Sequence, residues 1–260
     1  GNTGGTPGDE DYDDGLVDPK TCKGCGGVVT VPVPELEEVE QMDEEKTPCD
    51  KIIEQLNDSI FKTKENLINN SSAFHALQES GFSQNLNGSF NLLTASGSYS
   101  LDIPLTNNMI GFIHSHINSF ERDTNGDGIP DVVVSPIKMP SPGDIVVFLR
   151  LLTNAHNNQI SLMDIYGSMY SSSKSYTLKF TGDINDVIDG IDDLRTLENN
   201  GTLEKKFIEY FEDYNNKEKA FLKFLKNEIG IDGIRLFKIN GTIVREKFLD
   251  ENGDVNSQDC

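Results

Sequence analysis

Apolar positions recur at helical spacing early in the central part of the chain and then give way to short apolar runs. The helical spacing predicts one helix from about 48 to 69. It is set by Ile52, Ile53, Leu56, Ile60 and Leu67. Apolar runs separated by Asn-Gly and Ser-Gly pairs then predict strands at 90–93, 99–103 and 109–113.

The second half of the chain returns to helical periodicity and ends in a hairpin. The pattern predicts a helix at 141–154, strands at 160–166 and 176–180, and helices at about 184–197, 202–214 and 217–228. Asn240-Gly241 lies between apolar runs at 234–239 and 242–248 and is typical of a hairpin turn. Helices and strands follow one another without repeats, which indicates an α+β fold.

Residues 1–46 differ from the rest of the chain. They are rich in Gly, Pro, Asp and Glu and have little periodicity, so we expect a flexible acidic leader ahead of a domain at 47–260. The first five residues are typical of the polar linker behind a lipoprotein signal. We therefore expect an exported lipoprotein, at the cell surface or in the periplasm, that meets a membrane only through an N-terminal lipid anchor.

The charge of the chain limits its partners. The 43 acidic residues outnumber the 22 Lys and Arg residues, which gives a net charge of −21. Nucleic acids and anionic membrane surfaces would repel such a chain, so we expect neither as a partner. No apolar run reaches the roughly 18 residues that a membrane-spanning helix needs.

The four cysteines allow three disulfide pairings. We favour a bridge between Cys49 and Cys260, which would tie the first helix to the end of the chain. Cys22 and Cys25 are spaced like half of a zinc ribbon or a redox pair, but disulfide bonding in an exported protein is the simpler interpretation.

Two of the four histidines, His114 and His116, lie one residue apart behind an apolar run. On a strand, such residues point to the same face, so both imidazoles can bind one ion. Asp144, at the predicted start of the next helix, can supply a third ligand. Two His and one carboxylate leave a fourth position for water, as in catalytic zinc sites.

Gly111-Phe112-Ile113-His114-Ser115-His116, followed by Ser141-Pro142-Gly143-Asp144, resembles the JAMM (MPN+) zinc metalloproteases, most closely the JAMM-like domains of exported Bacteroidetes proteins. Glu79-Ser80-Gly81-Phe82 resembles the upstream glutamate motif of that family. The resemblance implies a cytidine-deaminase-like mixed sheet flanked by helices, with Zn²⁺ bound by His114, His116 and Asp144. It also implies that Glu79 is the general base and acid, that Ser141 stabilises the oxyanion, and that the enzyme hydrolyses an amide bond of a peptide or protein as a peptidase or isopeptidase.

Each motif also has a purely structural interpretation. Ser141, Pro142 and Asp144 form an ordinary helix start, with Ser as N-cap and an acid at N3. The two histidines alone are equally typical of a surface pair, and Glu79 alone of a solvated acid. The chain also departs from the family, because Ile117 replaces a proline and the interval from His116 to Asp144 is longer.

The longer interval contains an insertion at 119–139 with acidic residues at alternate positions. Asp123, Asn125, Asp127 and Asp131 resemble the Ca²⁺ loops of thrombospondin type 3 repeats, and a glycine allows the tight bend that oxygen ligands need. A polar turn without a metal is the alternative. If the insertion blocks the cleft, the protein would be a catalytically inactive, calcium-stabilised surface binding module.

Overall fold

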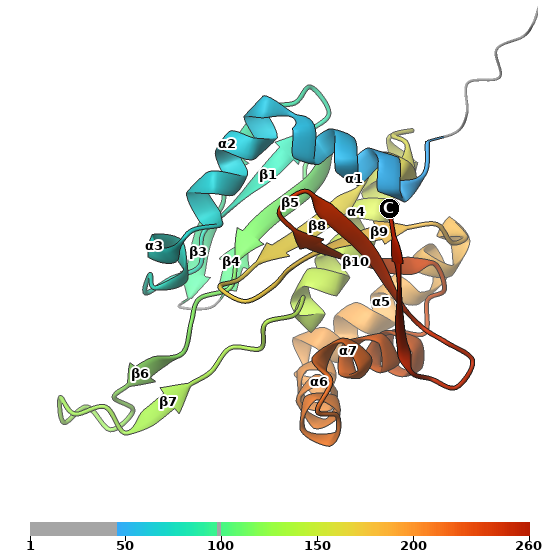
Figure 1. Cartoon of the computed structure of the whole chain (residues 1–260). Helices are drawn as coiled ribbons and strands as arrows, with labels where there is room; N and C mark the ends of the chain where they lie inside the picture. Colours follow the sequence, from blue (N-terminus) through green and yellow to red (C-terminus); the bar gives the residue numbers. More distant parts are fainter. Residues whose placement is uncertain (1–45, 98–99) are drawn as a thin grey trace, which may run out of the picture. The chain divides into compact units, whose positions relative to one another are not determined.

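A computed structural model describes residues 46–97 and 100–260 (Figure 1). The helices are α1 (Pro48–Asn57), α2 (Ser59–Ile68), α3 (Ser71–Phe74), α4 (Pro142–Asn157), α5 (Ile184–Asn199), α6 (Thr202–Asp213) and α7 (Lys217–Phe224), with a 3-10 helix η1 (Leu162–Asp164) and a π-helix η2 (Leu225–Ile229). The strands are β1 (Gly81–Asn85), β2 (Phe90–Leu92), β3 (Thr94–Gly97), β4 (Ser100–Asp102), β5 (Met109–Ser115), β6 (Phe120–Arg122), β7 (Val132–Val134), β8 (Tyr166–Tyr170), β9 (Ser175–Phe180), β10 (Ile234–Asn240), β11 (Ile243–Leu249) and β12 (Val255–Asp259).

Eight strands form one mixed sheet in the order β12-β11-β10-β9-β8-β5-β1-β2. All neighbours are antiparallel except β5 and β8, whose parallel pairing requires the crossover through α4. β3 with β4, and β6 with β7, form two separate two-stranded sheets. The predicted α+β fold with a mixed sheet and flanking helices is therefore confirmed.

The sheet separates two hydrophobic clusters. One contains Ile52 of α1 and Phe61 of α2, together with Ile113 of β5. The other contains much of α4, α5, α6 and α7, together with Phe112 of β5. Because consecutive strand residues point to opposite faces, Phe112 and Ile113 assign these helices to opposite faces of the sheet (Figure 1).

Glycines in β5 and β8 allow aromatic rings to lie across the neighbouring strand. Gly111 pairs with Tyr166, and Phe112 pairs with Gly167. A Cβ atom at Gly111 would lie 2.1 Å from the Tyr166 ring, and one at Gly167 would lie 2.7 Å from the Phe112 ring. These two positions need glycine because of close packing, and the packing fixes the register of the strand that carries the histidines.

The predicted helix at 48–69 is in fact two helices, α1 and α2. Asp58 is the C-cap of α1 and the N-cap of α2, and its carboxylate accepts a hydrogen bond from the Phe61 amide at 2.7 Å. An aspartate side chain competes well for backbone donors, so the helix breaks where the apolar spacing continues.

One strand prediction needs correction, and two strands of the main sheet were not predicted. The run at 160–166 is not a strand but a turn containing η1, and the strand begins only at Tyr166. β1 and β12 were not predicted, because they are short and their apolar content is low. Both are held in the sheet by long neighbouring strands, β5 and β11.

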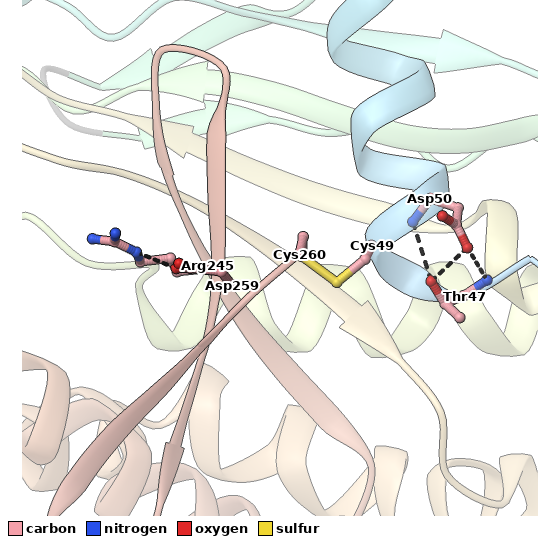
Figure 2. Close-up of a disulfide and its surroundings, with 6 residues drawn as sticks. All are labelled: Thr47, Cys49, Asp50, Arg245, Asp259 and Cys260. Carbon is pink, nitrogen blue, oxygen red and sulfur yellow. Dashed lines mark hydrogen bonds and ion pairs between the residues drawn. A yellow bond between two sulfur atoms is a disulfide. The ribbon is translucent and has the colours of Figure 1, made fainter.

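The predicted disulfide between Cys49 and Cys260 is present, with Cα atoms 5.3 Å apart (Figure 2). It joins α1 to the residue after β12 and closes a loop of 211 residues. Thr47 and Asp50 cap the start of the same helix reciprocally (Figure 2). A disulfide fits a protein outside the cytoplasm. Cys22, Cys25 and residues 1–45 of the expected acidic leader lie outside the described residues.

The insertion forms the β6–β7 hairpin, which reaches away from the main sheet (Figure 1). Its exposed apolar residues are Ile129, Val132 and Val133. In the part of the chain that the structure describes, no helix combines the length and hydropathy needed to cross a membrane.

Candidate metal centre

His114 and His116 lie at the carboxyl end of β5, on the same face as Phe112. Their side chains are 3% and 6% exposed, so both imidazoles are buried. The same-face prediction from their spacing is met, because the two Nε2 atoms lie 3.1 Å apart. Two buried nitrogens at this distance need a shared proton or a cation between them, since paired lone pairs would repel.

Glu79 is placed by the pairing of β1 with β5. Gly81 lies opposite His114, and the Ser115 amide donates to the Ser80 carbonyl at 2.9 Å. Extending this antiparallel register by one residue puts Glu79 opposite His116. A Cβ atom at Gly81 would lie 2.6 Å from the Ile113 carbonyl oxygen, so only glycine permits this close approach.

Asp144 comes from the first turn of α4. The Ser141 hydroxyl accepts a hydrogen bond from the Asp144 amide at 3.1 Å, while Asp144 Oδ2 accepts from the Ser141 amide at 2.7 Å. This reciprocal capping box is the structural interpretation of the motif, and it holds the Asp144 carboxylate still. The carboxylate meanwhile faces both histidines.

The distances among these side chains fit a small ion. Asp144 Oδ1 lies 3.2 Å from His114 Nε2, and Asp144 Oδ2 lies 3.6 Å from His116 Nε2. A tetrahedral ion with bonds of about 2.05 Å separates neighbouring ligand atoms by about 3.3 Å. The two nitrogens and the carboxylate therefore stand at about the spacing of ligand atoms around a small tetrahedral ion.

Glu79 also faces this group. Ligand atoms of Glu79, His114 and His116 all lie within 4.8 Å of one another. This buried cluster of Glu79 and the two histidines could hold a metal ion. The Asp144 carboxylate, which lies near both imidazoles, is the alternative carboxylate ligand. The closer approach of Asp144 to both nitrogens favours Asp144 in that position, while its assignment as a ligand stays a prediction.

His116 is oriented by the end of the insertion. Its Nδ1–H donates to the Ile137 carbonyl oxygen at 2.9 Å, which leaves Nε2 as the atom that faces His114. Such a bond on the far nitrogen is the usual support for a metal-binding histidine. His114 Nδ1, in contrast, is buried and has no hydrogen-bond partner in the described structure.

Burial raises the pKa of the Glu79 carboxyl to about 7. The Asp144 carboxylate adds to this rise, whereas His116 and Lys138 oppose it. Burial acts in the same direction on Asp144, but the two adjacent histidines outweigh it and hold the pKa of Asp144 well below its usual range. The site therefore contains one firmly ionised carboxylate and one that exchanges a proton near neutral pH.

Ser141 lies next to the cluster, but its hydroxyl proton is directed at Asp144 Oδ2 at 2.9 Å. The hydroxyl is thus part of the helix cap, and its role in holding an oxyanion stays a prediction.

The predicted calcium residues lie on the β6–β7 hairpin, apart from the metal cluster. Asp123 accepts from the amides of Gly126 and Gly128, at 2.6 and 2.7 Å. Asn125 and Asp127 accept from amides two residues onward, and Asp131 accepts from Thr124. These bonds are those of a polar turn, so Ca²⁺ binding by Asp123, Asn125, Asp127 and Asp131 stays a prediction.

Sequence reasoning missed two residues beside the cluster. Ile137 supplies the carbonyl for His116, and Lys138 donates a hydrogen bond to the Ile117 carbonyl oxygen next to the histidines. No local pattern marks them, because backbone carbonyls carry no signature in the sequence and the insertion brings both residues back from a distant turn.

Comparison of the chain with protein-family models, with curated proteins and with solved structures gives no match.

Proposed function

We propose that the protein is a zinc-dependent peptidase or isopeptidase of JAMM type that hydrolyses an amide bond. The observation that carries this proposal is the position of the proton-exchanging Glu79 carboxyl beside His114, His116 and Asp144 in a buried cluster. The resemblance of the same residues to the JAMM pattern supports it. The donor set itself fits zinc, which binds imidazole nitrogens and carboxylate oxygens in tetrahedral sites.

In the proposed reaction, His114, His116 and Asp144 would hold the ion. A zinc ion held there would supply Lewis acidity, which would make a water molecule acidic enough to act as the nucleophile near neutral pH. Glu79 accepts the proton of the attacking water and later returns it to the leaving amine. A carboxyl group with a pKa of about 7 is suited to both transfers at neutral pH.

The surroundings of Glu79 support this proton exchange. Its side chain is 8% exposed, so competing water is largely excluded. Lys138 opposes the effect of burial on the Glu79 pKa and thereby favours the ionised base. The Ile137 carbonyl keeps the His116 ring in one orientation while the proton moves.

A catalytically inactive, calcium-stabilised surface binding module is the second candidate. The observation in its favour is the β6–β7 hairpin, whose Ile129 and Val133 are 68% and 64% exposed. Exposed apolar side chains on a projecting hairpin are typical of contact surfaces. In this case the hairpin, and not the buried cluster, would carry the function.

Hydrolysis of a broad peptide mixture by the zinc-loaded protein distinguishes the peptidase from the inactive binding module. Mass spectrometry of the products should show new amine termini, which a chelator abolishes and added zinc restores. His116→Ala should be inactive, whereas His75→Ala, which changes an exposed histidine outside the cluster, should cleave like the wild type. The absence of zinc-dependent cleavage of any peptide bond or isopeptide bond would favour the binding module.

A further inference from the structure

A pocket of about 470 Å³ borders the candidate metal centre. Its walls come from the end of the insertion, the turn between β8 and β9, helix α6 and the first residue of α7. The volume is in the range of sites that bind small ligands or short pieces of a chain, about 300–1,000 Å³. Ile208 and Phe211 provide its apolar surface.

The pocket and the metal centre share one short segment. Ile137 lines the pocket, and its carbonyl oxygen accepts the hydrogen bond from His116. Lys138 also lines the pocket, and its ammonium group donates to the Ile117 carbonyl, one residue beyond His116. The pocket therefore lies beside the segment that supports the metal centre.

The charge of the pocket is the reverse of the charge of the chain. Lys138, Lys174 and Lys217 line it, against Glu212 as the acidic residue. Acidic residues outnumber basic ones by 43 to 22 in the whole sequence. A local excess of lysines attracts anions to the pocket. The rest of the surface is acidic and repels them.

Two of these three lysines form no ion pair with a described carboxylate. Among the described residues, no carboxylate lies within 4.0 Å of the ammonium groups of Lys138 and Lys217. Lys217 donates to the Phe211 carbonyl at 2.5 Å, which fixes its position without cancelling its charge. Lys174 lies 3.8 Å from Glu218, but the same glutamate already binds Lys238 at 2.9 Å and Lys247 at 3.3 Å.

We propose that this pocket binds a carboxylate group of a peptide substrate, next to the amide bond that is cleaved at the metal centre. The proposal rests on the proposed peptidase function for the identity of the ligand as a peptide. The carboxylate belongs either to an acidic side chain or to the C-terminus of the peptide. Lysine ammonium groups bind both as point charges, and the apolar wall packs against the adjoining carbon atoms.

Three N-acetylated Trp-Ala-Ala-Ala-X peptides test the proposal, with X as Glu amide, Gln amide or Ala with a free carboxyl group. The protein has no tryptophan, so fluorescence anisotropy of the peptide reports binding without background. The titrations use the Glu79→Gln protein, in which hydrolysis does not consume the probe. Comparing the first two peptides isolates an acidic side chain, and the third isolates the terminal carboxylate.

We expect at least one carboxylate peptide to bind about fivefold more tightly than the Gln amide peptide. In Lys174→Gln/Lys217→Gln this preference should fall to about one, and it should shrink in higher salt. Lys62→Gln/Lys205→Gln removes the same two charges from exposed lysines outside the pocket and should keep the preference. Unchanged thermal melting of the variants would show that they are folded.

Equal affinities for all three peptides would overturn the proposal, and so would a preference that survives in the double lysine variant. Failure of every peptide to bind up to millimolar concentration would overturn it as well. Failure of the proposed peptidase function is distinguished by a cleavage assay with the wild-type protein in the presence of zinc. In that case the peptides stay uncleaved, while the binding assay still shows the preference for a carboxylate.

Discussion

The Nδ1–H group of His116 donates a hydrogen bond to the carbonyl oxygen of Ile137 across 2.9 Å. This bond joins the end of β5 that carries both histidines to the last part of the insertion, 21 residues onward. The insertion therefore does more than lengthen the interval to Asp144, because its end sets which nitrogen of His116 faces His114. A segment that departs from the JAMM pattern thus supports the candidate centre.

Glu79→Gln should retain the metal and lower the rate of hydrolysis by about 10²-fold or more, because an amide cannot accept the proton. Metal analysis and peptide cleavage on the same preparation measure the two effects. Gln78→Ala, which changes the exposed residue beside Glu79, is a control for general damage to this segment. Loss of zinc together with activity would instead make Glu79 a ligand, as its closeness to both histidines allows.

The raised pKa of Glu79 predicts a dependence of stability on pH in the metal-free protein. The carboxyl has a pKa of about 7 in the folded state and 4.5 as its ordinary value, so the folded state binds more protons between these pH values. Stability should therefore fall as pH rises from about 4.5 to 7, by on the order of 3 kcal/mol at most.

Urea unfolding at pH 5 and pH 7.5 measures this change. In Glu79→Gln, which has no titrating carboxyl, the difference between the two pH values should be smaller by that amount. Identical pH dependence of the wild type and the variant would show that Glu79 is ionised in the folded protein at pH 5, contrary to its burial.

The structural features that could be predicted from the sequence are those determined by interactions between residues close together in the chain. The same-face placement of His114 and His116 follows from strand alternation, and the helix start at Asp144 follows from the Ser141 capping box. Sequence pattern also predicted the α+β class and the pairing of Cys49 with Cys260 as the favoured bridge.

What could not be predicted depends on contacts between distant segments. β1 is a short, polar strand, and its register against β5 depends on how closely Gly81 approaches Ile113. The burial of Glu79 and its raised pKa follow from that register. The break at Asp58 was hidden because the apolar spacing of α1 and α2 is continuous, while a side-chain cap decides where the helix ends.

The disulfide should stabilise the fold by restricting the unfolded chain. For so long a loop, Cys49→Ser/Cys260→Ser should lower the free energy of unfolding by about 2–5 kcal/mol, as measured by urea denaturation. The matched control is Arg245→Gln, which breaks the exposed ion pair with Asp259 beside the bridge (Figure 2) and should cost less than about 1 kcal/mol. An unchanged unfolding midpoint in the double serine variant would contradict a structural role for the bridge.

The calcium prediction is tested by thermal melting. A ligand bound only by the folded state stabilises that state, so millimolar Ca²⁺ should raise the melting temperature if Kd is micromolar. Asp127→Ala should erase the shift and leave zinc binding intact. If Ca²⁺ does not change the melting temperature of the wild-type protein, the calcium prediction is wrong. Asp123 would then only stabilise a turn, by accepting hydrogen bonds from the backbone amides of Gly126 and Gly128.

The central claim is that the buried cluster binds zinc, and metal content after zinc loading and exhaustive dialysis tests it most directly. Two matched variants, His116→Ala and His75→Ala, remove a histidine inside and outside the cluster. We predict one zinc ion per chain in the wild type and in His75→Ala, and essentially none in His116→Ala, because two remaining protein ligands rarely hold the ion. Zinc retained equally by all three proteins, or by none of them, would contradict the account.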